Sequence, residues 1–127
     1  MAALVLSAAA LFTLCGAAPR QTCVVDGDTF WLAGEKVRMA DINAPETAQA
    51  ECPSERQRGE AAKLRLLALL NAGPVELVDD ARSRDRYGRR LAVVARRGAS
   101  LGTQLVNEGL AEPWRGRRSS WCDMAGQ

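Results

Sequence analysis

Early in the chain, three strand-forming segments follow one another with only short turns between them. The segments are residues 21–25, 29–32 and 35–40, and the pairs Asp-Gly and Ala-Gly mark the turns. Strand and turn signals that alternate at this spacing are typical of hairpins, so we predict a three-stranded meander. Pro45 ends it, because proline cannot donate a hydrogen bond to a strand ladder.

A long helix is predicted after this meander. Ser54 is expected to be its N-cap, with Gln57 as the capping-box partner, and the helix is expected to end at Asn71 and Gly73. Apolar residues recur along this segment at helical spacing and predict one buried face, made of Ala62, Leu66, Leu69 and Leu70.

Two further strands and a short helix complete the predicted elements. The strands cover residues 75–78 and 91–95 with a polar loop between them, and Ser100 caps a helix that Gly109 stops. The inner face of this helix carries Leu101 and Leu105. Five short strands, with one helix between the third and the fourth and a short second helix, predict a mainly β, α+β fold: a small Greek-key barrel. Such barrels often bind oligonucleotides, but a fold alone does not assign a function.

The N-terminal segment has the pattern of a secretory signal peptide. No charged side chain precedes Arg20, and an apolar stretch is followed by small residues, although the usual basic start is missing. A membrane-anchoring helix is the alternative, whereas bulky Leu14 argues against a lipoprotein site at Cys15. We therefore predict a signal peptide over residues 1–18 and one domain with a short basic C-terminal tail over residues 19–127. The expected location is outside the cell or in the periplasm of a bacterium.

The chain has no histidine, which excludes histidine bases, nucleophiles and metal ligands. Acid–base chemistry must then use carboxylates, arginine, tyrosine, lysine or metal-bound water. No C-x-x-C pair is present, so a zinc site is not expected. Removal of the signal peptide would leave Cys23, Cys52 and Cys122, which allow one disulfide in any of three pairings and leave one thiol.

Arginines gather in two places although the net charge is only +2. Arginine presents a planar fork that suits phosphate, but a solvated basic surface is the alternative interpretation of either group. The two groups are Arg84, Arg86, Arg89 and Arg90, and Arg115, Arg117 and Arg118.

Two carboxylates, Asp26 and Asp28, lie at the first turn of the meander with Gly27 between them. An Asp-Gly pair alone is a common hairpin signal, because glycine accepts a positive φ and aspartate caps its own turn. That interpretation does not account for Asp28, whose place in a turn other polar residues could take.

Three stretches with matching spacing suggest what Asp28 does. They are "VVDGDTF", "VRMADINAPET" and "DRYGRRLAVV". Together they resemble the staphylococcal nuclease (thermonuclease) family, which has a V-x-D-G-D-T turn, a strand arginine five residues before D-x-P-E, and D-x-Y-G-R. Arg38 and Asn43 differ by five here, and Glu46 falls in register. The resemblance runs from about Cys23 to Trp114 and includes "LVNEGLA".

The resemblance implies a five-stranded OB-fold that cleaves DNA and RNA phosphodiesters with calcium and little sequence specificity. It also implies a monomer without a stable protein partner, and without a membrane once the signal is removed. The implied metal site consists of Asp28, Asn43 and the carbonyl of Ala44, with Asp26 close to the ion. Calcium prefers such oxygen ligands.

The resemblance also implies the catalytic groups. Arg38 and Arg89 would hold the scissile phosphate, and Glu46 would activate water. Tyr87 would flank the phosphate, and Trp114 or Tyr87 could stack on an unpaired base. Charge that develops on phosphate oxygens calls for cationic donors, and a carboxylate is the available base in a chain without histidine.

One residue separates this chain from a simple match to the family. The family usually has aspartate where this chain has Asn43, so one negative charge is lost beside the ion; Asp41, on the same strand face by alternation, is a candidate to restore it. The resemblance further places Cys52 and Cys122 on the active-site side, and implies a Cys52–Cys122 disulfide with Cys23 unpaired.

Two alternatives to a nuclease stay open. Asn43 favours an OB module that binds nucleic acid but is weak or inactive as a catalyst. A secreted protein-interaction domain is the other alternative.

Overall fold

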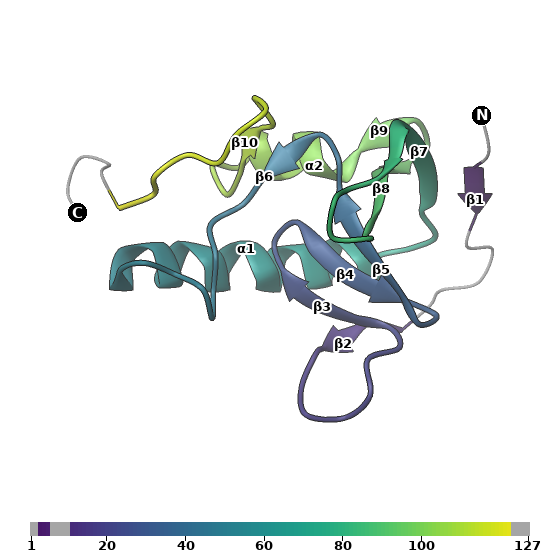
Figure 1. Ribbon diagram of the computed structural model, residues 1–127. Helices are drawn as coiled ribbons and strands as arrows, with labels where there is room; N and C mark the ends of the chain where they lie inside the picture. The colour runs from purple at the N-terminus through teal and green to yellow at the C-terminus, as the bar shows by residue number, and fades with distance from the viewer. Residues whose placement is uncertain (1–2, 6–10, 123–127) are drawn as a thin grey trace.

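The predicted meander forms one side of the molecule. The computed structural model describes residues 3–5 and 11–122 (Figure 1). Strands β3 (Cys23–Asp26), β4 (Thr29–Leu32) and β5 (Glu35–Met39) are antiparallel neighbours, as predicted. Thr29 pairs with Arg38 across β4 and β5, so the base of the first turn and Arg38 lie side by side.

Two later strands complete the barrel-type sheet. Strand β7 (Glu76–Arg84) is antiparallel to β8 (Arg90–Arg96), and β8 runs parallel to β5. The order of the five long strands is β3-β4-β5-β8-β7, which is the OB arrangement of a meander joined to a hairpin. The predicted α+β, OB-type fold is confirmed; the ladders of the described residues run as an open path from β7 to β3.

Two helices cover this sheet (Figure 1). Along the chain, helix α1 (Pro53–Asn71) comes after the meander and before β7. Helix α2 (Leu101–Asn107) follows the short strand β9 (Ala99–Ser100). All four residues of the predicted stripe on α1 are buried, and they pack in one core with β-strand residues such as Phe30 and Val37. The predicted cap of α2 is also confirmed, because Ser100 Oγ accepts from the N–H of Thr103 at 3.1 Å.

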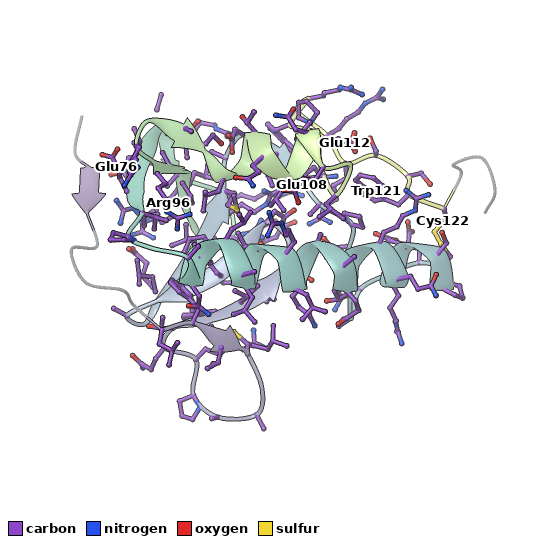
Figure 2. The ribbon with its side chains drawn as sticks, turned by 180° about the vertical axis from the view of Figure 1, so that it is seen from behind. Glu76, Arg96, Glu108, Glu112, Trp121 and Cys122 are labelled. Atoms are coloured by element: carbon purple, nitrogen blue, oxygen red, sulfur yellow. A yellow bond between two sulfur atoms is a disulfide. The ribbon has the colours of Figure 1, made fainter. Side chains whose placement is uncertain are left out.

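Contacts at both ends of α1 fix its position. Arg96, on β8, donates to the carbonyl oxygens of Leu69, Gly73 and Pro74 at the C-terminal end of the helix, whose last carbonyls have no partner inside it. Figure 2 shows Arg96 at this end and Trp121 and Cys122 at the other.

The start of α1 differs from the prediction. The N-cap is Cys52, whose sulfur accepts from the N–H of Glu55 at 3.4 Å, with Pro53 in the first turn. The predicted pair, Ser54 and Gln57, has the right spacing but lies two residues too late. Proline suits the first helical position because the N–H that it lacks has no partner there in any helix.

The polar loop predicted after the fourth strand is largely strand. Strand β7 continues to Arg84, with a register shift between Asp79 and Arg84 and a positive φ of 57° at Ser83. The exposed part of this hairpin needs no apolar face, so its composition does not indicate a strand. It ends in a turn where Gly88, with a φ of 80°, donates to the carbonyl of Asp85 at 3.0 Å.

Four short strands extend this framework. Strand β1 (Ala3–Val5) pairs with β7, and β2 (Thr13–Leu14) runs parallel to β3. Strand β6 (Ile42–Asn43) pairs with β10 (Glu112–Pro113), and this pair brings the C-terminal tail beside Asn43.

The segment predicted as a signal peptide contributes to the fold described here. The ring of Phe12 is buried against Phe30, and the side chain of Asn71 bonds both the N–H and the carbonyl of Phe12. Cys15 is bridged to Cys23, so the expectation of an unpaired Cys23 is wrong for the chain that retains Cys15. Residues 1–2 and 6–10 lie outside the described residues, and removal of residues 1–18 stays a prediction.

The second disulfide is the one that the resemblance implies. Cys52 and Cys122 are bridged, which ties the tail to the start of α1, while residues 123–127 lie outside the described part. Within the described residues, neither helix combines the length and apolar character needed to cross a bilayer.

Candidate active site

The two carboxylates of the first turn both bind the segment that follows β6. Asp28 is 2% exposed, and its Oδ2 accepts from the N–H of Ala44 at 2.8 Å. Asp26 Oδ1 accepts from the hydroxyl of Thr47 at 2.6 Å. Burial raises the pKa of Asp26 above its usual value; the Thr47 hydrogen bond opposes this rise, and the negative charge of Asp28 adds to it. The turn therefore anchors residues 44–47 from two sides.

Gly27 serves this arrangement in a way that the sequence does not indicate. Its φ is not among the positive values, so the turn itself does not require glycine. A Cβ at this position would lie 2.6 Å from the Cβ of Ala62 on α1 and 3.0 Å from that of Ala44. Glycine is needed because the turn approaches the helix closely.

Arg38 is buried, at 6% exposure, and holds the corner between β5 and β6. Its Nη1 donates to the carbonyls of Met39 and Ile42 at 2.5 and 2.9 Å, and its Nη2 lies 3.5 Å from Asp28 Oδ2. Its guanidinium stacks over Trp114, 5.6 Å from the ring centroid. Burial lowers the pKa of Arg38 from its usual value, and the charge of Asp28 opposes the change.

Arg89 comes from the β7–β8 hairpin. Its Nε donates to Asp85 Oδ2 at 2.6 Å, and its guanidinium lies 5.4 Å from the centroid of the exposed Tyr87 ring. Arg38, Arg89, Tyr87 and Trp114 line one pocket. The structure thus brings together the two predicted phosphate-binding arginines and the two predicted stacking residues.

Glu46 is held through its backbone and its side chain. Its N–H donates to Glu55 Oε2 at 3.0 Å, and its Oε2 accepts from Arg118 Nη1 at 2.5 Å. A side chain at Gly59 would collide with the carbonyl of Glu46, so glycine lets α1 support this loop. Burial raises the pKa of Glu46 above its usual value, although the hydrogen bond and charge of Arg118 act to lower it.

Asn43 and Glu46 line a second pocket beside the first. Arg118 borders both pockets and so lies where they meet. Asn43 is buried, and its Oδ1 is 3.5 Å from Arg38 Nη2, whereas its Nδ2 has no hydrogen-bond partner among the described residues.

The carboxylate of Asp41, the candidate to restore charge beside Asn43, makes its hydrogen bond to the start of α2. Asp41 Oδ2 accepts from the hydroxyl of Ser100 at 2.6 Å. A Cβ at Gly102 on α2 would come within 2.7 Å of the other oxygen, which shows how closely this carboxylate lies against the helix start. Strand alternation failed here because the chain turns after β5, so residues 41 and 43 do not continue one strand.

The predicted metal ligands, two carboxylates, an amide and a backbone carbonyl, have the chemistry of a calcium site. Across residues 11–122, no group of three or more acidic, cysteine or histidine side chains is arranged to hold an ion. Asp26 and Asp28 nevertheless lie near enough to Glu46 for their charges to raise its pKa further. The donors are all oxygens, as calcium prefers, so the residues present fit a hard cation.

Three residues at this site were not predicted as functional: Thr47, Glu55 and Arg118. Glu55 had a sequence signal, since it follows Cys52 at capping-box spacing, but cysteine is not among the usual caps. The sequence indicates Arg118 only as part of a basic group with Arg115 and Arg117. Nothing in its position along the chain indicates that it contacts Glu46.

The fold and the site together define an OB-type domain with a cationic, aromatic pocket bordered by carboxylates, a combination suited to phosphate. The family model for staphylococcal nuclease homologues matches residues 36–123, and the chain belongs to this family. The predicted family is therefore confirmed.

The comparisons with individual proteins agree with this family. The chain is 34% identical over 93 residues to the thermonuclease of Staphylococcus hyicus, covering 70% of this chain and 52% of that protein. It is 38% identical over 92 residues to endonuclease YncB of Bacillus subtilis, covering 68% and 43%. An uncharacterized endonuclease of Haemophilus influenzae is 34% identical over 112 residues, covering 80% and 58%. The chain thus spans about half the length of the curated relatives it matches.

Proposed function

We propose that this chain is a nuclease that hydrolyses phosphodiester bonds of DNA and RNA with calcium and with little sequence specificity. The observation that carries the proposal is one pocket lined by Arg38, Arg89 and two aromatic rings, next to the largely buried carboxylate of Glu46. The names of the relatives, thermonuclease and endonuclease, support the same reaction.

The side chains would share the reaction as follows. Arg38 and Arg89 bind the phosphate oxygens and stabilise the charge that develops on them. Glu46 takes the proton of the attacking water, a role that its raised pKa suits better than that of an exposed glutamate. Calcium, held by Asp28, Asn43 and the carbonyl of Ala44 with Asp26 nearby, would supply Lewis-acid stabilisation.

A second function is favoured by two observations. Glu46 is already paired with Arg118, and Asn43 contributes no charge. A site with both features also suits an OB module that binds nucleic acid without cleaving it.

Incubation of the purified protein with single-stranded DNA, with calcium or with a chelator, separates these functions on one gel. We expect degradation only with calcium. A mobility shift without degradation would indicate the binding module, and neither degradation nor a shift would indicate a protein-interaction domain.

Cleavage is expected to weaken steeply with salt and to depend little on base identity. Phosphate contacts release counterions, so affinity falls with ionic strength, and contacts to phosphate carry no sequence information. Stacking on Tyr87, 68% exposed, tolerates every base. The measurement is the cleavage pattern and rate on a mixed-sequence oligonucleotide from about 50 to 200 mM salt. A strict recognition sequence would count against the proposal.

Asn43→Asp is expected to tighten calcium binding about tenfold, which is about 1.4 kcal/mol. An added carboxylate places one more negative charge beside the ion, while the carboxylate of Asp41 is hydrogen-bonded to Ser100. The new charge also faces Arg38, which lies 3.5 Å from the Asn43 amide oxygen. Calcium titrations of the cleavage rate for both proteins give the result. An unchanged or higher half-saturating concentration would remove Asn43 from the ligand set.

The proposed location is outside the cytoplasm, after removal of residues 1–18, with the protein acting as a monomer. Disulfides persist in oxidising compartments, and the Cys52–Cys122 pair would survive this removal. Sequencing the N-terminus of the secreted or periplasmic protein tests the proposal, and a mature chain that starts before Cys15 would contradict it.

A further inference from the structure

An arginine of the tail, which we define as residues 114–122, forms an ion pair with Glu46, a residue distant from it in sequence. Arg118 Nη1 lies 2.5 Å from Glu46 Oε2, and the side chain of Glu46 is 15% exposed while that of Arg118 is 52% exposed. Among the described residues, Arg118 is the one cation that contacts this carboxylate. The arginine thus fixes the orientation of a side chain that the nuclease proposal assigns to water activation.

The tail has no helix or strand of its own, so anchors at its two ends position Arg118. At the start, the N–H of Trp114 donates to the carbonyl of Asp41 at 3.0 Å, directly after the β6–β10 pair. At the end, Trp121 is buried and Cys122 is bridged to Cys52. Figure 2 shows Trp121 and Cys122 beside the first turns of α1. Between these ends, the hydroxyl of Ser119 donates to Glu112 Oε1 at 2.6 Å. Opening the bridge would leave this bond, the first anchor and the burial of Trp121, but would release the covalent link to α1.

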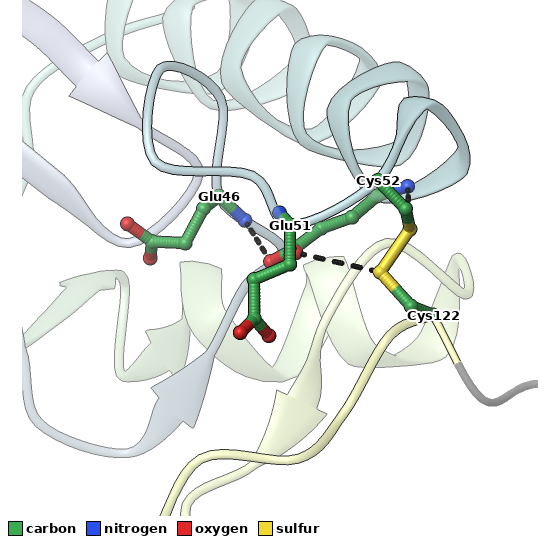
Figure 3. Close-up of a disulfide and its surroundings, with 5 residues drawn as sticks. Glu46, Glu51, Cys52 and Cys122 are labelled. Atoms are coloured by element: carbon green, nitrogen blue, oxygen red, sulfur yellow. Dashed lines mark hydrogen bonds between the residues drawn. A yellow bond between two sulfur atoms is a disulfide. The ribbon is translucent and has the colours of Figure 1, made fainter.

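The same bridge lies beside the group that holds the backbone of Glu46. Glu55 is 4% exposed, and its carboxylate accepts from the N–H of Glu46 at 3.0 Å and from that of Glu51 at 2.9 Å. The sulfur of Cys122 is 3.9 Å from Glu55 Oε1, and Cys52 caps the helix that carries Glu55 (Figure 3). One disulfide therefore joins the element that holds the backbone of Glu46 to the element that holds its side chain.

We propose that Arg118 is a positioning residue for Glu46 and that the Cys52–Cys122 disulfide keeps it in place. The inference rests on the proposed function, because it assigns Arg118 to the base of that reaction. A half-exposed ion pair contributes little to stability, but one that restricts a base to a single orientation raises the fraction of productive encounters. The predicted effect is therefore on the chemical step rather than on folding.

The other tail arginines provide a matched control. Arg115 is 70% exposed and lies 3.9 Å from Glu112, in no contact with Glu46. Arg115→Ala removes the same charge from the same segment, so it reports the general effect of losing a cation near the substrate.

The first experiment measures kcat and KM on a single-stranded oligonucleotide with calcium. We expect Arg118→Ala to lower kcat about tenfold with KM nearly unchanged, because only the transition-state step loses orientation. Arg118→Lys should recover part of the loss, since it restores one charged donor, and Arg115→Ala should leave kcat within about twofold. An equal or higher kcat for Arg118→Ala, or a loss confined to KM, would overturn the proposal.

The second experiment tests the bridge by coupling. Cys52→Ser with Cys122→Ser removes it, and serine keeps the helix cap that Cys52 provides. We expect this double variant to lose about as much kcat as Arg118→Ala, and the triple variant to lose little more, because both changes remove one interaction. Losses that multiply to about 100-fold would show that bridge and arginine act separately.

A third measurement needs no cleavage, so it separates this inference from the proposed function. The guanidinium N–H resonances of Arg118, identified by their absence from Arg118→Ala, are followed at fixed pH. The ion pair holds these protons against Glu46 Oε2, so Glu46→Gln should shift them, and removal of the bridge should shift them as well. If the wild-type protein does not cleave DNA, the proposed function fails while this measurement still tests the inference; resonances that neither change moves overturn it.

Discussion

Glu46→Gln is expected to lower the rate of phosphodiester cleavage by about 100- to 10,000-fold, the range that general acid–base catalysis contributes. Glutamine has almost the same shape, so Arg118 still has an oxygen to contact, and Glu55 still holds the backbone of residue 46. What is lost is the ability to accept a proton. Calcium and nucleotide binding should therefore change little, and single-turnover cleavage with separate binding measurements gives the comparison.

Glu51→Gln is the matched control. Glu51 lies in the same loop and borders the same pocket as Glu46, but it is exposed, and its carboxylate points away from the bridge (Figure 3). The neutral change at residue 51 should leave the rate within about twofold. If nucleotide binding falls in step with activity in Glu46→Gln, the carboxylate of Glu46 has a structural role instead.

The sequence predicts those parts of the fold that follow from local patterns. The stripe on α1 and the serine cap of α2 depend on neighbours three or four residues away, and both are found where they are predicted. The extension of β7 to Arg84 is not predictable in this way, because an exposed hairpin is stabilised by backbone pairing and carries no apolar alternation.

The candidate site likewise has some residues that the sequence predicts and others that it does not. A motif can place Arg38, Glu46 and Arg89 because their spacing is a property of the sequence. The hydrogen bonds of Glu55 and the contact of Arg118 depend on how α1 and the tail meet, and Arg118 reaches Glu46 across 72 positions of sequence. Gly27 shows the same limit: its role comes from the proximity of Ala62, not from the turn in which it lies.

The arginine pair is expected to have the second large effect. Arg38→Lys and Arg89→Ala should each lower the cleavage rate on the order of 100-fold, the loss seen when a donor to a developing oxyanion is removed. Lysine at position 38 keeps the charge but loses the fork that can reach two phosphate oxygens. Alanine is a poor test at position 38, because it would leave the carbonyls of Met39 and Ile42 without the donor they now have and so lower stability.

Position 89 allows the more severe change. Arg89 donates to Asp85 at the exposed hairpin turn, so its removal frees a carboxylate that water can solvate and leaves the core intact. Arg97→Ala provides a control for the loss of one positive charge, since residue 97 lies in the exposed β8–β9 turn, away from the pocket. Single-turnover rates are to be compared at saturating calcium, with thermal melting of each variant as the measure of folding. Near-wild-type turnover in Arg38→Lys or Arg89→Ala, in a protein that melts normally, would remove that arginine from the phosphate site.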